Sequence, residues 1–185
     1  MSDSATPRLA RGGVELVQFA GLQPLPALAR FSLRGELSML ASALQPAGIP
    51  ISRVACRAVE GERCATLWLG PDEQLLLARE VNAVEISEVL RASLANVAHS
   101  LVEISDRQTA FEVVGPTAGA LLNAGCPLDL SDAAFPVGMC TRTLFEKSEI
   151  VLWRTAADTF HVEVWRSFAH YVTALLAQAA GELGA

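Results

Sequence analysis

The sequence has little charge and no cluster of positive charge. Only 18% of the 185 residues are charged, and 14 Lys and Arg against 20 Asp and Glu leave a formal net charge of −6. The basic residues are scattered singly, whereas a protein that binds nucleic acid gathers them on one face to neutralise phosphates. The composition therefore argues against nucleic acid as a partner.

Long apolar runs and paired cysteines are also missing. No stretch approaches the roughly 18 uninterrupted apolar residues of a membrane span, and the first 13 residues lack the apolar core of a secretory signal. The four cysteines, at positions 56, 64, 126 and 140, form no C-x-x-C pair and have no histidine at zinc-finger spacing. These features predict a cytoplasmic protein with reduced thiols and no membrane partner.

Apolar side chains are present in excess. The types Ala, Val, Ile, Leu, Met, Phe, Trp, Tyr and Cys make up 51% of the chain, and 13 glycines come in addition. A typical domain reaches about 45–50% with glycine already counted. Most of this surplus enlarges the core, and the remainder predicts a surface that meets another protein.

The densest set of structural signals lies between Val102 and Leu130. Residues 108–114 are rich in β-branched and aromatic side chains and predict a strand. Gly115 ends this strand, and Pro116 suits the first position of a following helix. Gly125 stands where a helix is expected to end with a positive φ angle.

The two halves of the chain show a weak internal repeat. Phe31 and Gly35 recur as Phe111 and Gly115, and the pair Leu67-Trp68 recurs as Leu152-Trp153. Each half predicts the order β-α-β-β-β-α. In the first half, the three consecutive strands are expected at residues 51–56, 65–69 and 74–78. The final helix, residues 166 to about 180, has the strongest helical period, and Trp165 and Phe168 are expected on its apolar face.

These patterns predict an α+β fold. We expect duplicated β-α-β-β-β-α halves with antiparallel or mixed sheets and helices packed on one face of each sheet. Residues 1–27 are expected as a disordered tail and an extended arm, 28–104 as the first half and 105–185 as the second half of one compact body. In the arm, Pro24 and Pro26 favour either an edge strand or a segment lying on something else.

Few side chains are candidates for chemistry. His99 and His161 are expected on polar strand faces, and His170 on the exposed side of the last helix. Asp106 and Arg107 could anchor a carboxylate or orient a reacting amine. The simpler interpretation is a turn in which Asp106 caps backbone N–H groups and Arg107 pairs with a neighbouring carboxylate.

The remaining candidates are expected to be structural. Arg166 and Ser167 form a polar start to the last helix, and nothing around Cys126 or Cys140 indicates an electropositive site that would activate a thiol. The sequence contains no Walker loop, nucleophile elbow or dinucleotide fingerprint. We therefore predict no catalytic, cofactor-binding or metal-binding residue in this chain.

A set of short motifs together resembles one family, the gamma subunit of heterotetrameric sarcosine oxidase. No single motif is diagnostic, but their order and spacing are specific. The motifs are Ser105-Asp106-Arg107-Gln108-Thr109-Ala110, Gly115-Pro116, Gly125-Cys126-Pro127-Leu128-Asp129-Leu130, Phe135-Pro136-Val137-Gly138, Thr143-Leu144, Leu152-Trp153-Arg154 and Arg166-Ser167-Phe168-Ala169.

The resemblance implies a duplicated module similar to the folate-binding part of the glycine-cleavage aminomethyltransferase. It also implies a complex that oxidatively demethylates sarcosine to glycine and yields formaldehyde or 5,10-methylenetetrahydrofolate together with hydrogen peroxide. Larger flavin-binding alpha and beta subunits are expected to hold FAD, FMN and NAD, with tetrahydrofolate as the one-carbon acceptor, and a small zinc-binding delta subunit completes the assembly. The gamma chain is expected to be non-catalytic, and its apolar surplus to form an interface.

A second interpretation is a stand-alone tetrahydrofolate-binding or aminomethyltransferase-like protein with a pterin in the groove between the halves. Such a site needs a buried carboxylate and an apolar or aromatic wall. Glu103, Glu112 and Glu163 lie in expected strands and could supply the carboxylate, although a strand glutamate usually faces water. For the isolated chain, a homodimer that hides the apolar surface is expected.

Overall fold

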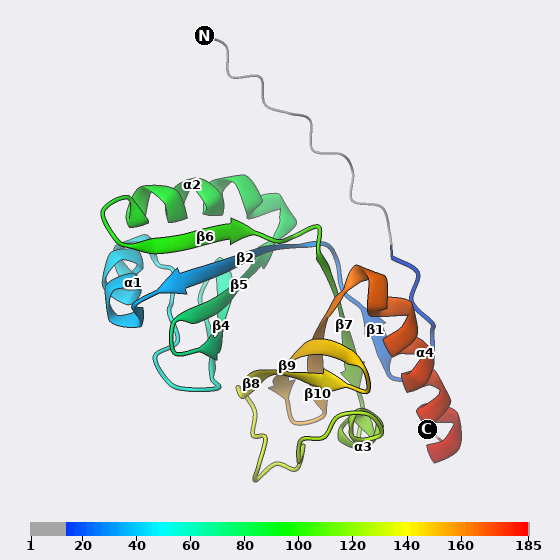
Figure 1. Cartoon of the computed structure of the whole chain (residues 1–185). Coiled ribbons are helices and arrows are strands. Elements are labelled where there is room, and N and C mark those ends of the chain that lie inside the picture. The colour runs from blue at the N-terminus through cyan, green and yellow to red at the C-terminus, as the bar shows by residue number, and fades with distance from the viewer. Residues whose placement is uncertain (1–13, 185) are drawn as a thin grey trace.

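Two five-stranded antiparallel sheets form the centre of the protein (Figure 1). The computed structural model describes residues 14–184, so the predicted disordered tail, residues 1–13, lies outside the described residues. Every pairing between strands is antiparallel. The predicted α+β class is confirmed, and of the two expected sheet types the antiparallel one is found.

The elements of each half follow the predicted order. The first half contains β2 (Leu28–Gly35), α1 (Leu37–Leu44), β3 (Ala58–Glu60), β4 (Cys64–Gly70), β5 (Glu73–Arg79), α2 (Ala83–Leu94) and β6 (His99–Glu103), with short 3-10 turns at Gln45–Ala47 and Glu80–Asn82. The second half contains β7 (Gln108–Val114), α3 (Ala118–Asn123), β8 (Cys140–Phe145), β9 (Ser148–Ala156), β10 (Thr159–Trp165) and α4 (Arg166–Leu183). Both read β-α-β-β-β-α, and β6 adds a strand to the first.

The sheets have matching strand orders, which the duplication explains. One sheet runs β6-β2-β5-β4-β3 and the other runs β1-β7-β10-β9-β8. The place of β6 beside β2 is taken in the second sheet by β1 (Leu22–Pro24), which comes from the N-terminal arm and pairs with β7. The arm was expected to form either an edge strand or a segment lying on something else, and residues 22–24 form an edge strand.

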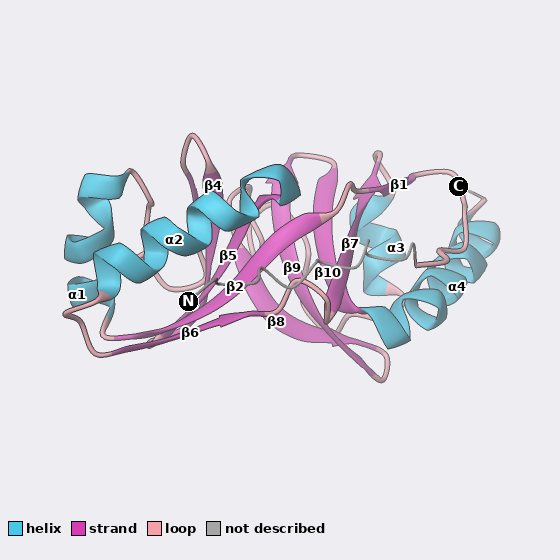
Figure 2. Ribbon diagram, turned by 90° about the horizontal axis from the view of Figure 1, so that it is seen from above, coloured by secondary structure: helices cyan, strands magenta, loops and turns pink. Residues whose placement is uncertain are grey.

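The two sheets lie face to face with helices on the outside, so that the protein has four layers (Figure 2). Successive side chains of a strand point to opposite faces of its sheet. In β2, Phe31 and Leu33 pack against α1 and α2, and in β10, Phe160 and Val162 pack against α3 and α4. A third, smaller apolar cluster lies between the sheets and contains Leu67, Leu75, Leu77, Cys140, Val151 and Trp153. The predicted packing of helices on one face of each sheet is confirmed.

Two sequence interpretations of the first half are wrong. Residues 51–56 form no strand, because side chains from Thr66 and Gln74 donate to the carbonyls of Pro50 and Ser52 where a neighbouring strand would. The repeat of Leu67 in Leu152 is out of register: the two lie on equivalent strands, but Leu67 faces the other sheet and Leu152 faces the helices. Since side chains alternate, an odd shift reverses the face.

Two details of the helices also differ from expectation. Gly125 does not have a positive φ angle; a Cβ at this position would lie 2.9 Å from Cζ of Phe145, so the glycine is needed for close approach. Pro116 lies in the turn before α3, which begins at Ala118. Helix α4 starts at Arg166 as predicted, but Phe168 is 41% exposed and Trp165 is 38% exposed rather than packed in the core. Among residues 14–184, no helix has the length and apolar character to cross a lipid bilayer.

Candidate functional site

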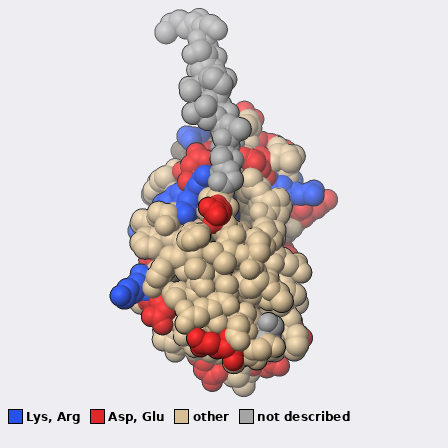
Figure 3. Space-filling view, turned by 90° about the vertical axis from the view of Figure 1, so that its right-hand side faces the viewer, with Lys and Arg blue, Asp and Glu red and all other residues tan. Residues whose placement is uncertain are grey.

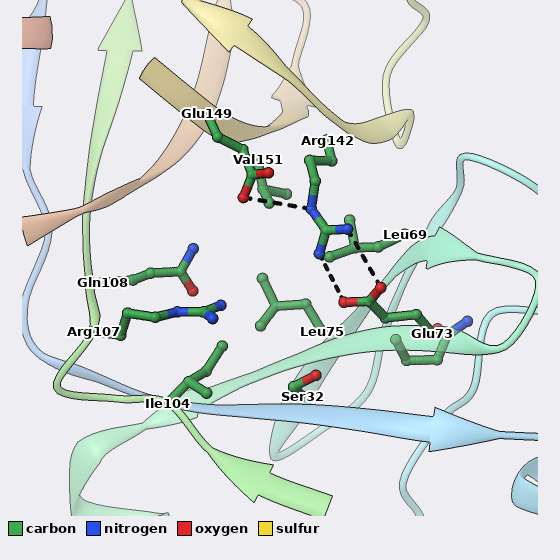
Figure 4. A pocket seen from close by; sticks show the side chains of 11 residues that line it. Ser32, Leu69, Glu73, Leu75, Ile104, Arg107, Gln108, Arg142, Glu149 and Val151 are labelled. Carbon is green, nitrogen blue, oxygen red and sulfur yellow. Dashed lines mark hydrogen bonds and ion pairs between the residues drawn. The ribbon is translucent and has the colours of Figure 1, made fainter. Parts of the chain in front are cut away.

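The candidate site is a small polar cavity at the open end of the space between the two sheets. Its volume is about 10 Å³, which suffices for one water molecule. Side chains from both sheets surround it: Ser32 and Glu73 come from the first, Gln108 and Arg142 from the second, and Arg107 stands directly before β7 (Figure 4). The crossover from β6 to β7 therefore brings part of the Ser105–Ala110 motif to this cavity.

Glu73 is held between two arginines at one side of the cavity. Its Oε2 accepts from Nη2 of Arg34 at 3.0 Å, and its Oε1 accepts from Nη2 of Arg142 at 2.7 Å. Arg142 also lies near Glu149, with 3.7 Å between Nε and Oε1. Burial alone would raise the pKa of Glu73, but the two arginines outweigh it and lower this pKa below its usual value. The pKa of Arg142 is raised mainly by its hydrogen bond to Glu73, so both members of this pair are charged at neutral pH.

Arg107 and Gln108 form the opposite side of the cavity. The guanidinium of Arg107 lies over the Trp165 ring, 5.3 Å from its centroid, in the geometry of a cation–π contact. No carboxylate of the described residues forms an ion pair with Arg107, so its expected pairing is wrong. Gln108 is 6% exposed, and its Oε1 has no hydrogen-bond partner within the described part of the chain. Such an unsatisfied buried acceptor costs about 1–3 kcal/mol.

A second polar cluster joins the two sheets, and the sequence analysis predicted only part of it. Nε of Arg30 donates to Oε2 of Glu163 at 2.5 Å, and Nε2 of His161 lies 2.9 Å from Oε1 of Glu163. The rings of His161 and Trp153 are 5.7 Å apart. All four residues are at most 7% exposed. The expectation of a polar strand face for His161 is wrong, because this strand is covered on both faces. Of the two possibilities for Glu163, a water-exposed side chain and a buried carboxylate, the buried one is found.

The other sequence candidates do not gather at either cluster. His99 and His170 are exposed, and Glu103 lies on the exposed strand β6. Arg166 and Ser167 begin α4, where the backbone N–H of Arg166 donates to the carbonyl of Arg107 at 3.0 Å. The signal that could have revealed Arg30 is its alternation with Ala29 and Phe31, which places it on the face of β2 opposite the helices.

Two of the cysteines, Cys64 and Cys140, are not activated. Burial raises the pKa of Cys64 to about 11 and that of Cys140 to about 12, so both thiols are protonated at neutral pH, and only a thiolate is an effective nucleophile. Cys126 is 4% exposed. In the described part of the chain no group of three His, Cys, Asp or Glu residues is arranged to hold a metal ion.

Neither the cavity between the sheets nor the groove beside α1 suits a pterin. A ligand pocket for a molecule of this size measures about 300–1,000 Å³, and the cavity between the sheets measures about 10 Å³. A groove of about 420 Å³ between the end of α1 and Pro50 is large enough, but its only charged lining residue is Arg53. It therefore lacks the carboxylate that pairs with pteridine nitrogens. The residues of the site form ion pairs around a small polar cavity. Such an arrangement suits a structural or docking role.

Taken together, the fold and site define a duplicated α+β protein of the helix–sheet–sheet–helix type whose two sheets are joined by an apolar cluster and by ion pairs. Residues 35–182 match the sequence profile of the "Sarcosine oxidase, gamma subunit family". The chain belongs to this family, as the motifs around Arg107 indicated. This membership favours the gamma subunit over the stand-alone folate protein.

Two curated relatives are sarcosine oxidase gamma subunits. The protein from Corynebacterium sp. strain P-1 is 32% identical over 148 residues, which are 80% of this chain and 71% of that protein. The protein from Corynebacterium sp. strain U-96 is 31% identical over 121 residues, which are 65% of this chain and 58% of that protein. The matched region thus spans about six to seven tenths of these relatives.

Two solved structures share the fold. A chain of the heterotetrameric sarcosine oxidase from Corynebacterium sp. U-96, in complex with pyrrole 2-carboxylate, superposes with a TM-score of 0.78 at 24% identity and covers 92% of this chain and 89% of its own. The glycine cleavage system aminomethyltransferase T from Bartonella henselae superposes with a TM-score of 0.65 at 14% identity, over 84% of this chain and 45% of its own. The predicted similarity to the aminomethyltransferase fold is confirmed.

Proposed function

We propose that this chain is the non-catalytic gamma subunit of a heterotetrameric sarcosine oxidase, an assembly that demethylates sarcosine to glycine. The observation that carries the proposal is the family match over residues 35–182. The hydrogen-bonded ion pair between Glu73 of the first sheet and Arg142 of the second supports it, because the pair joins the two halves beside a cavity of only about 10 Å³. The role of the chain is to support the shape of the complex.

The chemistry then belongs to the companion subunits. Alpha and beta subunits hold FAD, FMN and NAD, tetrahydrofolate accepts the one-carbon unit, and a small delta subunit completes the complex, which works in the cytoplasm. The high thiol pKa values of Cys64 and Cys140 support a passive role for this chain, since neither thiol is a nucleophile at neutral pH. Hydrogen peroxide and formaldehyde or methylenetetrahydrofolate are products of the whole assembly.

The surface around α4 suits a protein partner. One side of the molecule, the right-hand side in Figure 1, presents a broad area without Lys, Arg, Asp or Glu (Figure 3). Phe168 and Tyr171 of α4 are 41% and 36% exposed. Aromatic side chains are enriched and charged ones depleted in the centres of protein interfaces. This area is the proposed contact with the larger subunits, and in the isolated chain it is available to a second copy.

The test is co-expression of the tagged chain with alpha, beta and delta subunits. A stable four-subunit complex that carries the flavin is expected, while the chain expressed alone is expected to be colourless and to give no binding heat with tetrahydrofolate in calorimetry. Flavin bound to the isolated chain, or saturable tetrahydrofolate binding to it, would refute the non-catalytic assignment and support the stand-alone folate protein.

A further inference from the structure

At the mouth of the inter-sheet cavity, one positively charged side chain has no carboxylate partner among the described residues. Four charged groups at one side already satisfy each other, because Glu73 accepts from Arg34 and Arg142, and Arg142 also lies beside Glu149. Arg107, at the opposite side, has no ion-pair partner within the part of the chain that the structure describes (Figure 4). Its side chain is nevertheless held in place, because the guanidinium lies over Trp165.

Gln108 adds a second, independent indication. This side chain is 94% buried, lines the cavity next to Arg107, and leaves its Oε1 without a partner. A half-turn about χ3 exchanges Oε1 with Nε2, so the amide is able to offer either an acceptor or a donor at this position. A native structure rarely leaves a buried side-chain polar atom unpaired without a reason. The unused bonding position of Gln108 and the unused positive charge of Arg107 face the same cavity.

Both features suit a carboxylate. The guanidinium edge donates two parallel hydrogen bonds to the two oxygens of a carboxylate, and a neighbouring amide N–H of Gln108 is able to donate a third. Ser32 lines the same cavity with a hydroxyl group (Figure 4). A single carboxylate in this position would form an ion pair with Arg107 and a hydrogen bond with the buried amide of Gln108.

The size of the cavity decides where the carboxylate comes from. About 10 Å³ accepts a group the size of a water molecule, such as one carboxylate oxygen, but no complete ligand molecule. The group must therefore enter from outside while the rest of its molecule stays on the surface. Around the mouth, Arg107 is exposed and Trp165 is 38% exposed, and Arg and Trp are the residue types that contribute most to protein interfaces.

We infer that an aspartate or glutamate side chain of a companion subunit enters this mouth and pairs with Arg107, with the backbone of that subunit lying across Trp165. The inference rests on the proposed function, because it requires the chain to sit in an assembly. It names a second contact besides the uncharged area on α4, and Trp165, which directly precedes α4, connects the two.

The experiment compares charge reversals in the co-expressed complex. Arg107→Glu is expected to lower the yield of co-purified alpha and beta subunits at least tenfold, and Arg107→Gln to lower it less. Arg91→Glu is the matched control, because Arg91 is an exposed arginine of α2 whose Nε donates to Oγ of Ser87 at 3.4 Å; this variant is expected to assemble normally. Thermal unfolding of each isolated variant verifies that Arg107→Glu still folds.

The assembly results and a titration with acetate distinguish failure of the inference from failure of the proposed function. Unchanged assembly of Arg107→Glu would overturn the inference while leaving the proposed function intact, whereas failure of the wild-type chain to join the larger subunits would refute the proposed function and the inference together. Sodium acetate is the probe for a free carboxylate: the NMR signals of the Arg107 Nε–H and the Gln108 amide in the isolated chain are expected to stay unchanged. Saturable shifts at millimolar acetate would assign the mouth to a small ligand instead of a companion subunit.

Discussion

Nε of Arg30 donates to Oε2 of Glu163 at 2.5 Å, although one residue belongs to the first sheet and the other to the second. Their side chains are 3% and 0% exposed. Arg30 also donates from Nη1 to the carbonyl of Leu28, and its backbone N–H donates to Oγ of Ser105 at 2.9 Å. The pair is therefore a charged contact that fixes how the two halves face each other.

Removal of the negative charge of this pair is expected to destabilise the protein. Glu163→Gln leaves Arg30 buried without its counter-charge, and the free energy of unfolding should fall by about 3 kcal/mol. Chemical unfolding of the isolated chain measures this. The control is Glu85→Gln, because the Glu85–Arg63 pair is exposed at 60% and 32% and should contribute less than about 1 kcal/mol.

The double variant Arg30→Met/Glu163→Leu gives the second half of this test. Since both charges are removed, it is expected to lose less stability than the sum of the losses in Glu163→Leu alone and Arg30→Met alone. Strict additivity of the two single effects would show that Arg30 and Glu163 do not act as a pair.

The cluster at Glu73 predicts a specific acid sensitivity. The pKa of Glu73 is lowered in the folded chain, so its carboxylate stabilises the fold fully above the unfolded value of about 4.3, and this contribution is lost as pH falls through the folded value. Stability measured between pH 7 and pH 3 should therefore decline less steeply at the acid end in Glu73→Gln than in the wild type. An equal decline of the stability of the two proteins at the acid end would contradict the lowered pKa of Glu73.

The thiols are expected to react in a defined order. Cys56 is half-buried, whereas Cys64, Cys126 and Cys140 are buried, and burial raises the pKa of Cys64 and Cys140 to about 11 and about 12. Iodoacetamide at pH 8 should label Cys56 first in the native chain and all four thiols in denaturant, as measured by peptide mass spectrometry. Labelling of Cys140 as fast as Cys56 would show that the space between the sheets opens readily.

Gly125 is expected to tolerate no side chain. A Cβ there would lie within 3.0 Å of three Phe145 ring atoms, and such overpacking typically costs about 1–3 kcal/mol. Gly125→Ala should lower the unfolding free energy by this amount. Gly119→Ala is the matched control, because the nearest atom to its Cβ would be 3.8 Å away, and alanine favours a helix by up to about 1 kcal/mol over glycine. Equal effects of the two substitutions would exclude the ring contact as the cause.

The order of elements could be predicted because its signals are local. Apolar periodicity, strand-forming residues and turn residues act within a few positions, and they predicted the duplicated halves and the start of α4 at Arg166. The strand prediction for residues 51–56 was wrong because an apolar segment has the same sequence pattern in a strand and in a loop. In the structure, the distant side chains of Thr66 and Gln74 donate to the carbonyls of Pro50 and Ser52 at the start of this segment.

The polar clusters could not be predicted because their partners are far apart in the sequence. Arg30 and Glu163 are separated by 133 positions, and Glu73 and Arg142 by 69. Periodicity assigns each of these residues to a strand face, but it does not say that a second sheet covers that face. His161 was therefore expected on a polar strand face although it is buried, and Arg107 was expected beside a carboxylate although it lies over Trp165.

The position of β1 has a consequence for synthesis on the ribosome. Residues 22–24 leave the exit tunnel long before β7, the strand with which they pair. They therefore remain unpaired while the whole first half is synthesised. Contacts between such distant segments form late and slowly. Until then one border of β7 is bare and open to pairing with other nascent chains, and closure of this border by the chain's own beginning completes the second sheet.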